Sequence, residues 1–222
     1  RGLIVWLLNT RLGGGGSTSF PVTVDNGAAQ AGASAESLDQ LKARCNAPGA
    51  LDKYTDCRLI KVFHIADQVW HDDFAARGRE YSSPQLAFFS GQTQTGCGPA
   101  SSDVGPFYCP ADHEIYLDLD FLDVLQQKFG ASGQYAQAYI VAHEFGHPLQ
   151  TELGIEPQVR QLQQRNPSRE NDFSVALELQ ADCFAGAWAN KSGVPVNGQS
   201  TPIKLTQQNI QSRIRGAILM AC

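Results

Sequence analysis

The amino-acid sequence predicts an α+β fold, in which a small antiparallel sheet lies beside several helices. One segment, 114–121, alternates apolar and polar residues with the period of a half-buried strand. Several longer segments instead space their apolar residues three or four positions apart, as helices do. Stretches rich in Gly and Pro separate the segments and mark the turns between them.

The composition is that of a globular protein. The chain has 222 residues, of which 42% are hydrophobic and 18% charged, which suits one well-filled domain. The net charge is −5 and the sequence pI is near 5.5. Because nucleic-acid-binding domains present a basic face, this balance argues against a nucleic-acid partner.

Residues 1–35 are predicted to be the end of a membrane anchor followed by a Gly/Ser-rich linker. The apolar run GLIVWLL at 2–8 is too short to span a bilayer alone, and we interpret it as the exit end of a transmembrane helix or the tail of a signal segment. A soluble N-terminal strand is the alternative. The segment 10–35, with its four consecutive glycines, has the composition of a flexible linker. Residues 36–222 then form the folded domain.

The remaining elements follow in order along the chain. Ser37 is a suitable N-cap for a short helix, and Gly78 is a suitable stop for the helix that begins near Asp56. Strand-like segments are expected at 84–91 and 114–121, on either side of a loop at 95–112. Further helices are expected at 121–130, 133–147, 157–166, 171–190 and 206–222.

In the alternating strand, one set of side chains is apolar and the other is polar. The two sets are Ile115, Leu117 and Leu119 on one face, and Tyr116, Asp118 and Asp120 on the other. We therefore expect one buried face and one exposed face.

The six cysteines indicate disulfide bonds. None of them forms a CxxC pair, so a zinc ribbon is disfavoured. Pairing in sequence order gives Cys45–Cys57 and Cys97–Cys109, both with a spacing of twelve, and Cys183–Cys222. Disulfides would place the chain in an oxidising compartment. The alternative is six buried thiols in a cytoplasmic protein.

The segment VAHEFGH, 141–147, has the spacing of a zinc site. His143 and His147 are four residues apart, so on a helix both imidazoles lie on one face and can reach the same ion. Glu144 is placed to act as the base that takes a proton from water activated by the metal. The alternative is a pair of core or surface histidines beside a solvated glutamate.

A second pair of residues supplies the remaining ligand. Glu178 and Asp182 are also four apart, inside an otherwise apolar run from 173 to 188. One carboxylate can bind zinc, while the other accepts the second ring N–H of a ligand histidine and sets its tautomer. The alternative is an exposed polar stripe on an amphipathic helix.

Three blocks of the sequence resemble a known family. AYIVAHEFGH at 138–147, SVALELQADCFAGAWA at 174–189 and the segment 95–125 look like the neutral zinc metallopeptidases of bacteria, which are membrane-anchored HExxH zincins. The resemblance covers roughly residues 57–190. It implies a zincin-like α+β fold and an N-terminal transmembrane helix.

The resemblance also implies roles for individual residues. The implied zinc ligands are His143, His147 and Glu178, the implied catalytic base is Glu144, and Asp182 is the implied partner of a ligand histidine.

Other residues are weaker candidates. His113 and Tyr116 are candidates to contact the substrate or stabilise the oxyanion from a strand beside the active-site helix, with Tyr135 and Tyr139 as alternatives. His64 and His71 are interpreted as structural or surface histidines. Phe145, Leu149 and the strand 114–119 are expected to line the cleft. The sequence contains no GxSxG segment, which disfavours a serine hydrolase, and its glycine-rich RLGGGGS segment is not a P-loop.

Pro148 directly follows His147, where the resembling family usually carries histidine or a polar residue. Proline has no N–H to donate to the carbonyl of Glu144, and its ring crowds that carbonyl. We therefore expect the helix to kink or end within a turn after His147, with water or another donor reaching the carbonyl of Glu144.

The sequence as a whole predicts a zinc-dependent peptidase acting on peptide or protein substrates. Its metallopeptidase domain, 36–222, is expected outside the cytoplasm of a bacterium, held at the cell membrane by a single N-terminal anchor. The alternatives are an inactive, zinc-stabilised domain that binds an envelope or membrane partner, and a latent enzyme whose cleft is covered by its own N-terminal segment.

Overall fold

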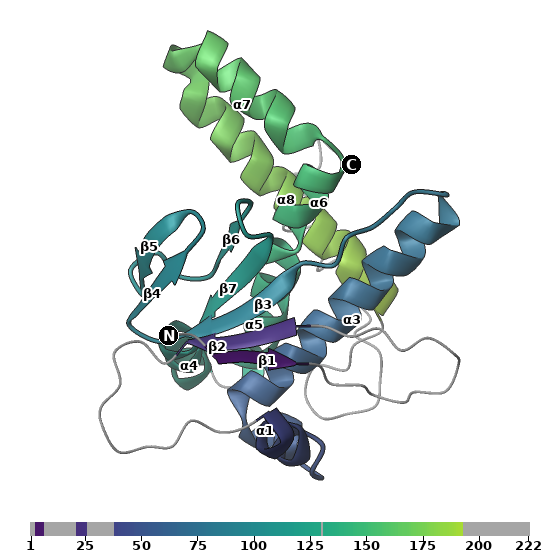
Figure 1. The fold of residues 1–222 in the computed structure, drawn as a ribbon, viewed down its shortest axis with the longest axis vertical. Helices are drawn as coiled ribbons and strands as arrows, with labels where there is room; N and C mark the ends of the chain where they lie inside the picture. The colour runs from purple at the N-terminus through teal and green to yellow at the C-terminus, as the bar shows by residue number, and fades with distance from the viewer. Residues whose placement is uncertain (1–2, 7–20, 26–37, 130, 193–222) are drawn as a thin grey trace.

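The computed structural model of the chain describes residues 3–6, 21–25, 38–129 and 131–192. These residues form an α+β fold in which helices pack against a small five-stranded sheet (Figure 1). The strand order is β1-β2-β3-β7-β6, and β4 and β5 form a separate hairpin. The strands are β1 Leu3–Trp6, β2 Pro21–Asp25, β3 Gln85–Phe89, β4 Gln92–Thr95, β5 Gly98–Ser101, β6 Phe107–Cys109 and β7 Glu114–Asp118.

The sheet is mixed, so the prediction of an antiparallel sheet is wrong. β1 pairs with β2 and β6 with β7 in antiparallel fashion, but β2–β3 and β3–β7 are parallel pairs. The chain passes from β3 to β6 at the edge of the sheet and then turns back into β7, which lies between them. β7 therefore runs antiparallel to its hairpin partner β6 and parallel to β3.

Both faces of β7 are buried, contrary to the expected exposed polar face. Ile115 and Leu117 belong to the main core. Tyr116 faces a second apolar cluster, together with Ala87, Phe89 and Cys109. Since β7 has a neighbouring strand on each side and an apolar cluster on each face, alternation in its sequence does not lead to exposure.

Asp118, a buried polar residue of this strand, has local partners instead of solvent. The Oδ1 atom of Asp118 accepts hydrogen bonds from the backbone N–H groups of Asp120 and Phe121, at 2.9 and 3.3 Å. Asp118 thereby caps the next helix, which begins at Leu119. The predicted strand therefore ends three residues early.

The helices pack mainly on one another and on β3 and β7. They are α1 Leu38–Cys45, α2 Ala50–Lys53, α3 Thr55–Ala76, α4 Leu119–Phe129, α5 Ala131–Glu144, α6 Gly146–Glu152, α7 Ile155–Arg165, the 3₁₀ turn η1 Pro167–Arg169 and α8 Glu170–Ser192. As predicted, α3 stops just before Gly78, which has a φ of 63°. Helix α7 and the first half of α8 lie side by side and project away from the sheet (Figure 1).

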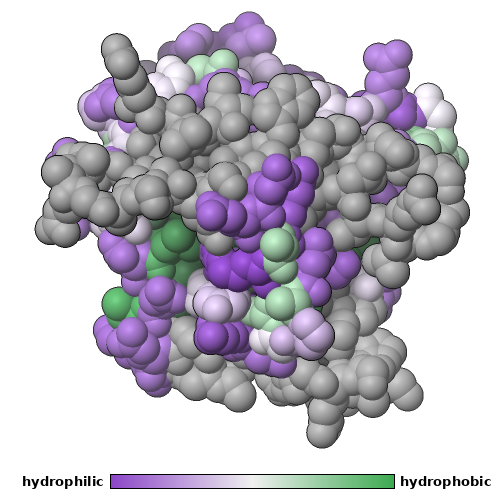
Figure 2. Space-filling model, turned by 60° about the horizontal axis from the view of Figure 1, so that its bottom comes forward, coloured by the Kyte–Doolittle hydropathy of each residue, from purple (hydrophilic) through white to green (hydrophobic). Residues whose placement is uncertain are grey.

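The core lies between α3, α5, α8 and the central strands. Phe63 of α3 packs on Phe145, with ring centroids 4.7 Å apart, and Trp188 of α8 is 1% exposed. Phe145 and Leu149 are 0% and 1% exposed, so they belong to this core, and the prediction that they line the cleft is wrong. On the face shown in Figure 2, hydrophilic side chains predominate among the coloured residues, as expected when apolar side chains lie inside.

Two of the predicted disulfides are present. Cys45–Cys57 joins α1 to the start of α3, and Cys97–Cys109 joins the β4–β5 turn to β6. Cys183 is also disulfide-bonded. Cys222, its predicted partner, lies outside the described residues, as does the predicted helix 206–222.

The N-terminal strands bear on the anchor and linker prediction. Leu3–Trp6, within the apolar run at 2–8, forms β1 in the sheet, as in the alternative interpretation. Pro21–Asp25, within the predicted linker, forms β2, so the linker prediction is wrong for these residues. The other residues of 1–35 lie outside the described part. Among the helices that the structure describes, none is long and apolar enough to cross a membrane.

Candidate metal centre

Helices α5 and α6 place the two histidines of the HExxH segment. His143 lies in the last turn of α5 and His147 in the first turn of α6, and the assigned helices are interrupted at Phe145. Phe145 keeps helical torsions, with φ −63° and ψ −24°. The two imidazoles therefore stay on one face, with ring centroids 5.2 Å apart.

The interruption lies at a different place from the one predicted. The helix breaks at Phe145, between the two histidines, and not in the turn after His147. Pro148 has no N–H to donate to the carbonyl of Glu144. The pattern of helical hydrogen bonds is therefore interrupted on the N-terminal side of the proline. The next bond, from the N–H of Leu149 to the carbonyl of Phe145, is long at 3.4 Å.

A close contact between α6 and α8 brings two carboxylates, those of Glu178 and Asp182, to the helix face that carries the two histidines. A Cβ atom at Gly146 would lie 2.6 Å from the Cα and 2.7 Å from the Cβ of Ala181, so only glycine fits. Ala181 is three residues after Glu178 and one before Asp182 on α8. The approach of α6 to α8 at Gly146 therefore brings both carboxylates to the histidines.

Three side chains converge as a possible metal site. One ligand atom each from His143, His147 and Glu178 lies within 4.8 Å of the others, and within the described residues this is the one such group of histidine, cysteine and acidic side chains. The Nε2 atom of His143 is 3.1 Å from Oε2 of Glu178. The Nε2 atom of His147 is 3.9 Å from Oε1 of the same carboxylate.

The other nitrogen of each imidazole is held by a neighbour. Nδ1 of His143 is 2.9 Å from Oδ1 of Asp182, which also accepts a hydrogen bond from the hydroxyl of Tyr139 at 3.0 Å. A carboxylate can only accept, so Nδ1 of His143 donates its proton to Asp182. Nε2 of His143 also faces a carboxylate, that of Glu178, so this contact needs either a second proton on the ring or a metal ion between the two atoms.

Gln150 holds the second imidazole and was not anticipated from the sequence. Its Nε2 donates to the carbonyl of Leu177 at 2.7 Å, so its Oε1 is left to accept from Nδ1 of His147 at 3.1 Å. Gln150 is 1% exposed. The signal in the sequence was a glutamine three residues after His147. Its partner on α8 could be named only from the structure, which packs α8 beside it.

Glu144 is almost fully buried yet reaches the cleft. It is 7% exposed, and its burial raises the pKa of the carboxyl group to about 7, with His143 opposing this shift and Glu178 adding to it. Burial also lowers the pKa of His147 below its usual value, which favours the neutral imidazole needed for metal binding. A carboxyl group with a pKa near 7 can accept and return a proton at neutral pH.

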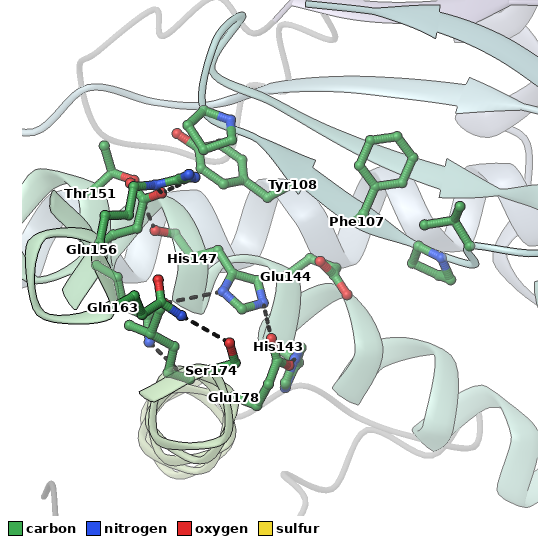
Figure 3. A pocket seen from close by; sticks show the side chains of 16 residues that line it. Phe107, Tyr108, His143, Glu144, His147, Thr151, Glu156, Gln163, Ser174 and Glu178 are labelled. Carbon is green, nitrogen blue, oxygen red and sulfur yellow. Dashed lines mark hydrogen bonds and ion pairs between the residues drawn. The ribbon is translucent and has the colours of Figure 1, made fainter. Parts of the chain in front are cut away.

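The site opens into a cleft of about 470 Å³ (Figure 3). One wall comes from β6 and the segment before it, and the other from α6, α7 and α8. Its lining residues are Val104, Pro106, Phe107, Tyr108, Pro110, His143, Glu144, His147, Gln150, Thr151, Glu156, Arg160, Gln163, Ser174, Leu177 and Glu178. We expected the strand that is β7 in the structure to line the cleft. The edge strand β6 lines it instead.

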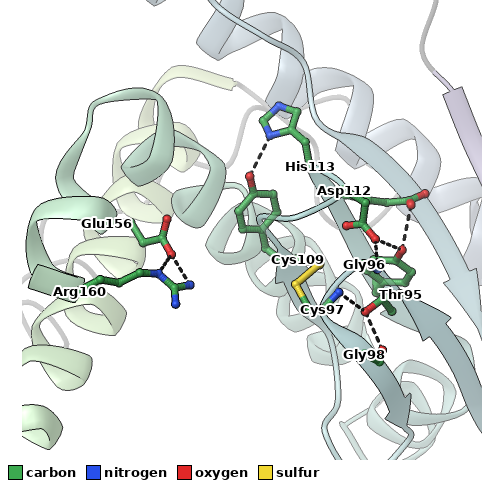
Figure 4. Close-up of a disulfide and its surroundings, with 12 residues drawn as sticks. Thr95, Gly96, Cys97, Gly98, Cys109, Asp112, His113, Glu156 and Arg160 are labelled. Carbon is green, nitrogen blue, oxygen red and sulfur yellow. Dashed lines mark hydrogen bonds and ion pairs between the residues drawn. A yellow bond between two sulfur atoms is a disulfide. The ribbon is translucent and has the colours of Figure 1, made fainter. Parts of the chain in front are cut away.

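His113 and Tyr116 are not among the residues that line the cleft. Tyr116 is 4% exposed and donates its hydroxyl to Asp112 and Glu114. His113 lies behind Tyr108, which does line the cleft, with its Nδ1 2.8 Å from the Tyr108 hydroxyl (Figure 4).

The tautomer of His113 follows from its second contact. Its Nε2 is 3.1 Å from the carbonyl of Ser82, which can only accept a hydrogen bond. Nδ1 of His113 therefore accepts from the hydroxyl of Tyr108. Burial raises the pKa of Tyr108 to about 12, so its hydroxyl stays protonated at neutral pH.

This set of groups is typical of a metal-dependent hydrolase: two oriented imidazoles, a third carboxylate ligand and a buried carboxyl group beside an open cleft. Sequence comparison gives the family. A sequence model of the family described as "Putative neutral zinc metallopeptidase" matches residues 3–216, and the chain belongs to this family. The predicted family is thus confirmed, and zinc is the cofactor that membership implies.

Two uncharacterized bacterial proteins share long stretches of the chain. The uncharacterized protein YpfJ of Escherichia coli K12 is 51% identical over 130 residues, which cover 58% of this chain and 45% of that protein. The uncharacterized protein Rv2575 of Mycobacterium tuberculosis H37Rv is 38% identical over 179 residues, which cover 78% of this chain and 58% of that protein. The chain therefore spans about half the length of these relatives. No solved structure matches it significantly.

Proposed function

We propose that this chain hydrolyses peptide bonds in the cleft beside α6, with zinc held by His143, His147 and Glu178. One observation carries the proposal: three ligand atoms converge within 4.8 Å at a cleft that the buried carboxyl group of Glu144 also lines. Two imidazoles and one glutamate are a ligand set of catalytic zinc, which keeps one position open for water or substrate.

The spacing of the ligand atoms suits zinc. Bonds of 2.0–2.1 Å in tetrahedral geometry separate neighbouring ligand atoms by roughly 3.3 Å. The two measured contacts of Glu178 with the imidazoles, 3.1 and 3.9 Å, lie on either side of this value. Asp182 and Gln150 hold the other ring nitrogens, so the metal-facing nitrogens need no reorientation.

Zinc bound at these ligands supplies a Lewis acid that polarises the scissile carbonyl and lowers the pKa of water to about 7. Glu144 accepts a proton from the attacking water and returns it to the leaving amine. Its pKa of about 7 suits both steps.

Tyr108 is the residue we assign to the developing oxyanion, in place of His113 and Tyr116. Its hydroxyl lies at the cleft, is protonated at neutral pH and can rotate from His113 to the substrate carbonyl oxygen. The exposed edge of β6 beside it can hold an extended peptide by backbone pairing.

Glu144→Gln and Tyr108→Phe test these roles in a chelator-sensitive assay with a denatured protein substrate. We expect Glu144→Gln to lower kcat by about 10²–10⁴-fold and to retain about one zinc per chain by metal analysis, because the ligands are unchanged. Tyr108→Phe should lower kcat by about 10²-fold with little change in KM. Loss of zinc from Glu144→Gln, or full activity, would contradict the base assignment. Zinc binding without turnover by the wild type would favour the inactive, partner-binding alternative.

We also propose that the domain works outside the cytoplasm, at the bacterial cell membrane. Two disulfides in the described residues support an oxidising compartment. The single N-terminal anchor rests on the resemblance to the family, because Leu3–Trp6 of the apolar run at 2–8 lies in β1 of the sheet. Thiol labelling after cell fractionation tests both points: reduced cysteines or a cytosolic chain would contradict them.

A further inference from the structure

The two ends of the cleft differ in polarity. Phe107 lies on the side of Glu144, away from Glu156 and Gln163 (Figure 3). Val104, Pro106 and Pro110, which precede and follow β6, are further apolar residues that line the cleft. The second end is lined by polar side chains of α6, α7 and α8, namely Thr151, Glu156, Arg160, Gln163 and Ser174.

Arg160 supplies the positive charge at the polar end. Of the residues that line the described cleft, it is the one with a permanent positive charge. Its guanidinium group extends from α7 toward the strand that carries Cys109 (Figure 4). The side chain is 62% exposed, so its charge is accessible to solvent rather than buried in the protein interior.

Glu156 holds the guanidinium in place. Its Oε1 accepts from Nε and Nη2 of Arg160, both at 2.5 Å, while its Oε2 accepts from the hydroxyl of Thr151 at 3.2 Å. The side chain of Glu156 is 15% exposed. Glu156 precedes Arg160 by four residues on α7, and its hydrogen bond to Thr151 of α6 restrains the carboxylate, which limits the rotamers of Arg160 before any ligand binds.

This pairing leaves donors free for a ligand. A guanidinium group has five N–H donors in a planar fork, and Glu156 engages two of its nitrogens. Both N–H groups on Nη1 and the second N–H on Nη2 remain for an acceptor in the cleft. Planar carboxylates match such a fork with two parallel hydrogen bonds.

We propose that Arg160 forms a subsite for a carboxylate group of the peptide substrate, at the polar end of the cleft on the α7 side of the metal centre. The proposal rests on the peptidase function proposed above and adds the substrate class. An internal aspartate or glutamate side chain and a C-terminal carboxylate share this chemistry. The Phe107 end would accept apolar residues on the other side of the scissile bond.

Matched peptides test the subsite. The first pair differs by Glu against Gln on one side of the cleavage site, and the second by a free against an amidated C-terminus. We expect zinc-loaded wild type to prefer one carboxylate member by at least about tenfold in kcat/KM. Arg160→Gln should abolish that preference, and Arg160→Glu should shift it toward peptides that carry lysine. The peptide pair whose members differ in kcat/KM identifies which carboxylate Arg160 binds.

Arg165→Gln is the control, because Arg165 lies on the same helix but does not line the cleft. Arg160→Lys keeps the charge and loses the fork, so it should retain only part of the preference. Peptide binding to zinc-loaded Glu144→Gln, measured by fluorescence anisotropy with and without Arg160→Gln, gives a second readout that does not depend on turnover.

The outcomes separate the two proposals. If the wild type cleaves peptides but shows no carboxylate preference, or keeps it in Arg160→Gln, the subsite is refuted while the peptidase function stands. If no peptide is cleaved, the function fails, and the binding assay alone decides whether Arg160 reads a carboxylate.

Discussion

At the scale of single residues, the candidate site depends on a few side chains whose freedom is restricted by close neighbours. Asp182 and Gln150 each hold one imidazole nitrogen, and Glu156 holds the guanidinium of Arg160. Because Gly146 has no side chain, α6 can approach Ala181 of α8 closely. Geometry suited to catalysis comes from such restrictions rather than from the ligands alone.

Gly146→Ala is expected to weaken zinc binding. The added Cβ would lie 2.6 Å from the Cα of Ala181, so α8 must shift and take Glu178 with it. We expect zinc affinity to fall by about tenfold or more, and the free energy of unfolding of the zinc-free protein to fall by about 1–3 kcal/mol. Competition with a chromogenic chelator and urea titration measure the two quantities.

Gly186→Ala is the matched control, because a Cβ there meets no atom within 4 Å and Gly186 also lies in α8. Replacing this helical glycine should leave zinc affinity unchanged and stabilise the fold by up to about 1 kcal/mol. Equal zinc affinity in Gly146→Ala and wild type would show that the close approach does not position Glu178.

At the scale of elements, the helices that carry the site are held by packing on α3 and the central strands. Phe145, inside the zinc motif, packs on Phe63 of α3. Helix α3 also carries Asp67, which is 1% exposed and accepts a hydrogen bond from the hydroxyl of Tyr81 at 2.8 Å. Burial raises the pKa of this carboxyl group, and the hydrogen bond from Tyr81 lowers it by less. The pKa of Asp67 is therefore raised from 3.8 to about 6.

The raised pKa of Asp67 predicts a pH-dependent stability. In the folded state the protonated form is favoured, so the contribution of Asp67 is fully present below pH ~4 and is lost as the pH rises through about 6. Asp67→Asn should therefore be more stable than wild type above pH ~7, by an amount on the order of 2–3 kcal/mol, and equal to it near pH 4.

Urea titration of the zinc-free proteins between pH 4 and 8 measures this difference. Asp120→Asn is the control, since Asp120 is exposed and its replacement should show no such trend. A variant Asp67→Asn that is less stable than wild type at pH 8 would contradict the assignment.

At the scale of the whole molecule, the three metal-facing side chains come from separate helices. His143 lies on α5, His147 on α6 and Glu178 on α8. A zinc ion at these ligands would link the core helices to the projecting α7–α8 pair (Figure 1). Binding to the folded chain alone must stabilise it by mass action.

Zinc removal is therefore expected to lower the thermal stability. At a free zinc concentration 100 times the dissociation constant, the stabilisation is about 2.7 kcal/mol, and the Tm should fall when a chelator removes the ion. Differential scanning fluorimetry with a series of zinc buffers measures this. Restoration by zinc but not by magnesium, and no response in His143→Ala/His147→Ala, are the matched controls. An unchanged Tm would argue against a zinc site that links the helices.

Local spacing decided what could be inferred from the sequence alone. His143 with His147, and Glu178 with Asp182, share helix faces because both pairs are four residues apart, and the structure brings both pairs together. Cys45–Cys57 and Cys97–Cys109 also follow from spacing, since each closes a short loop. These inferences need only helix geometry and chain proximity.

The tertiary structure decided everything that depends on which distant segments pack together. The direction of β7, the edge position of β6, the contact of Gly146 with Ala181 and the entry of Arg160 into the cleft join segments far apart in the chain. The sequence determined the candidate metal ligands, because a helix repeats every 3.6 residues wherever it lies. It could not determine the cleft, because packing between elements depends on the whole core and not on any one segment.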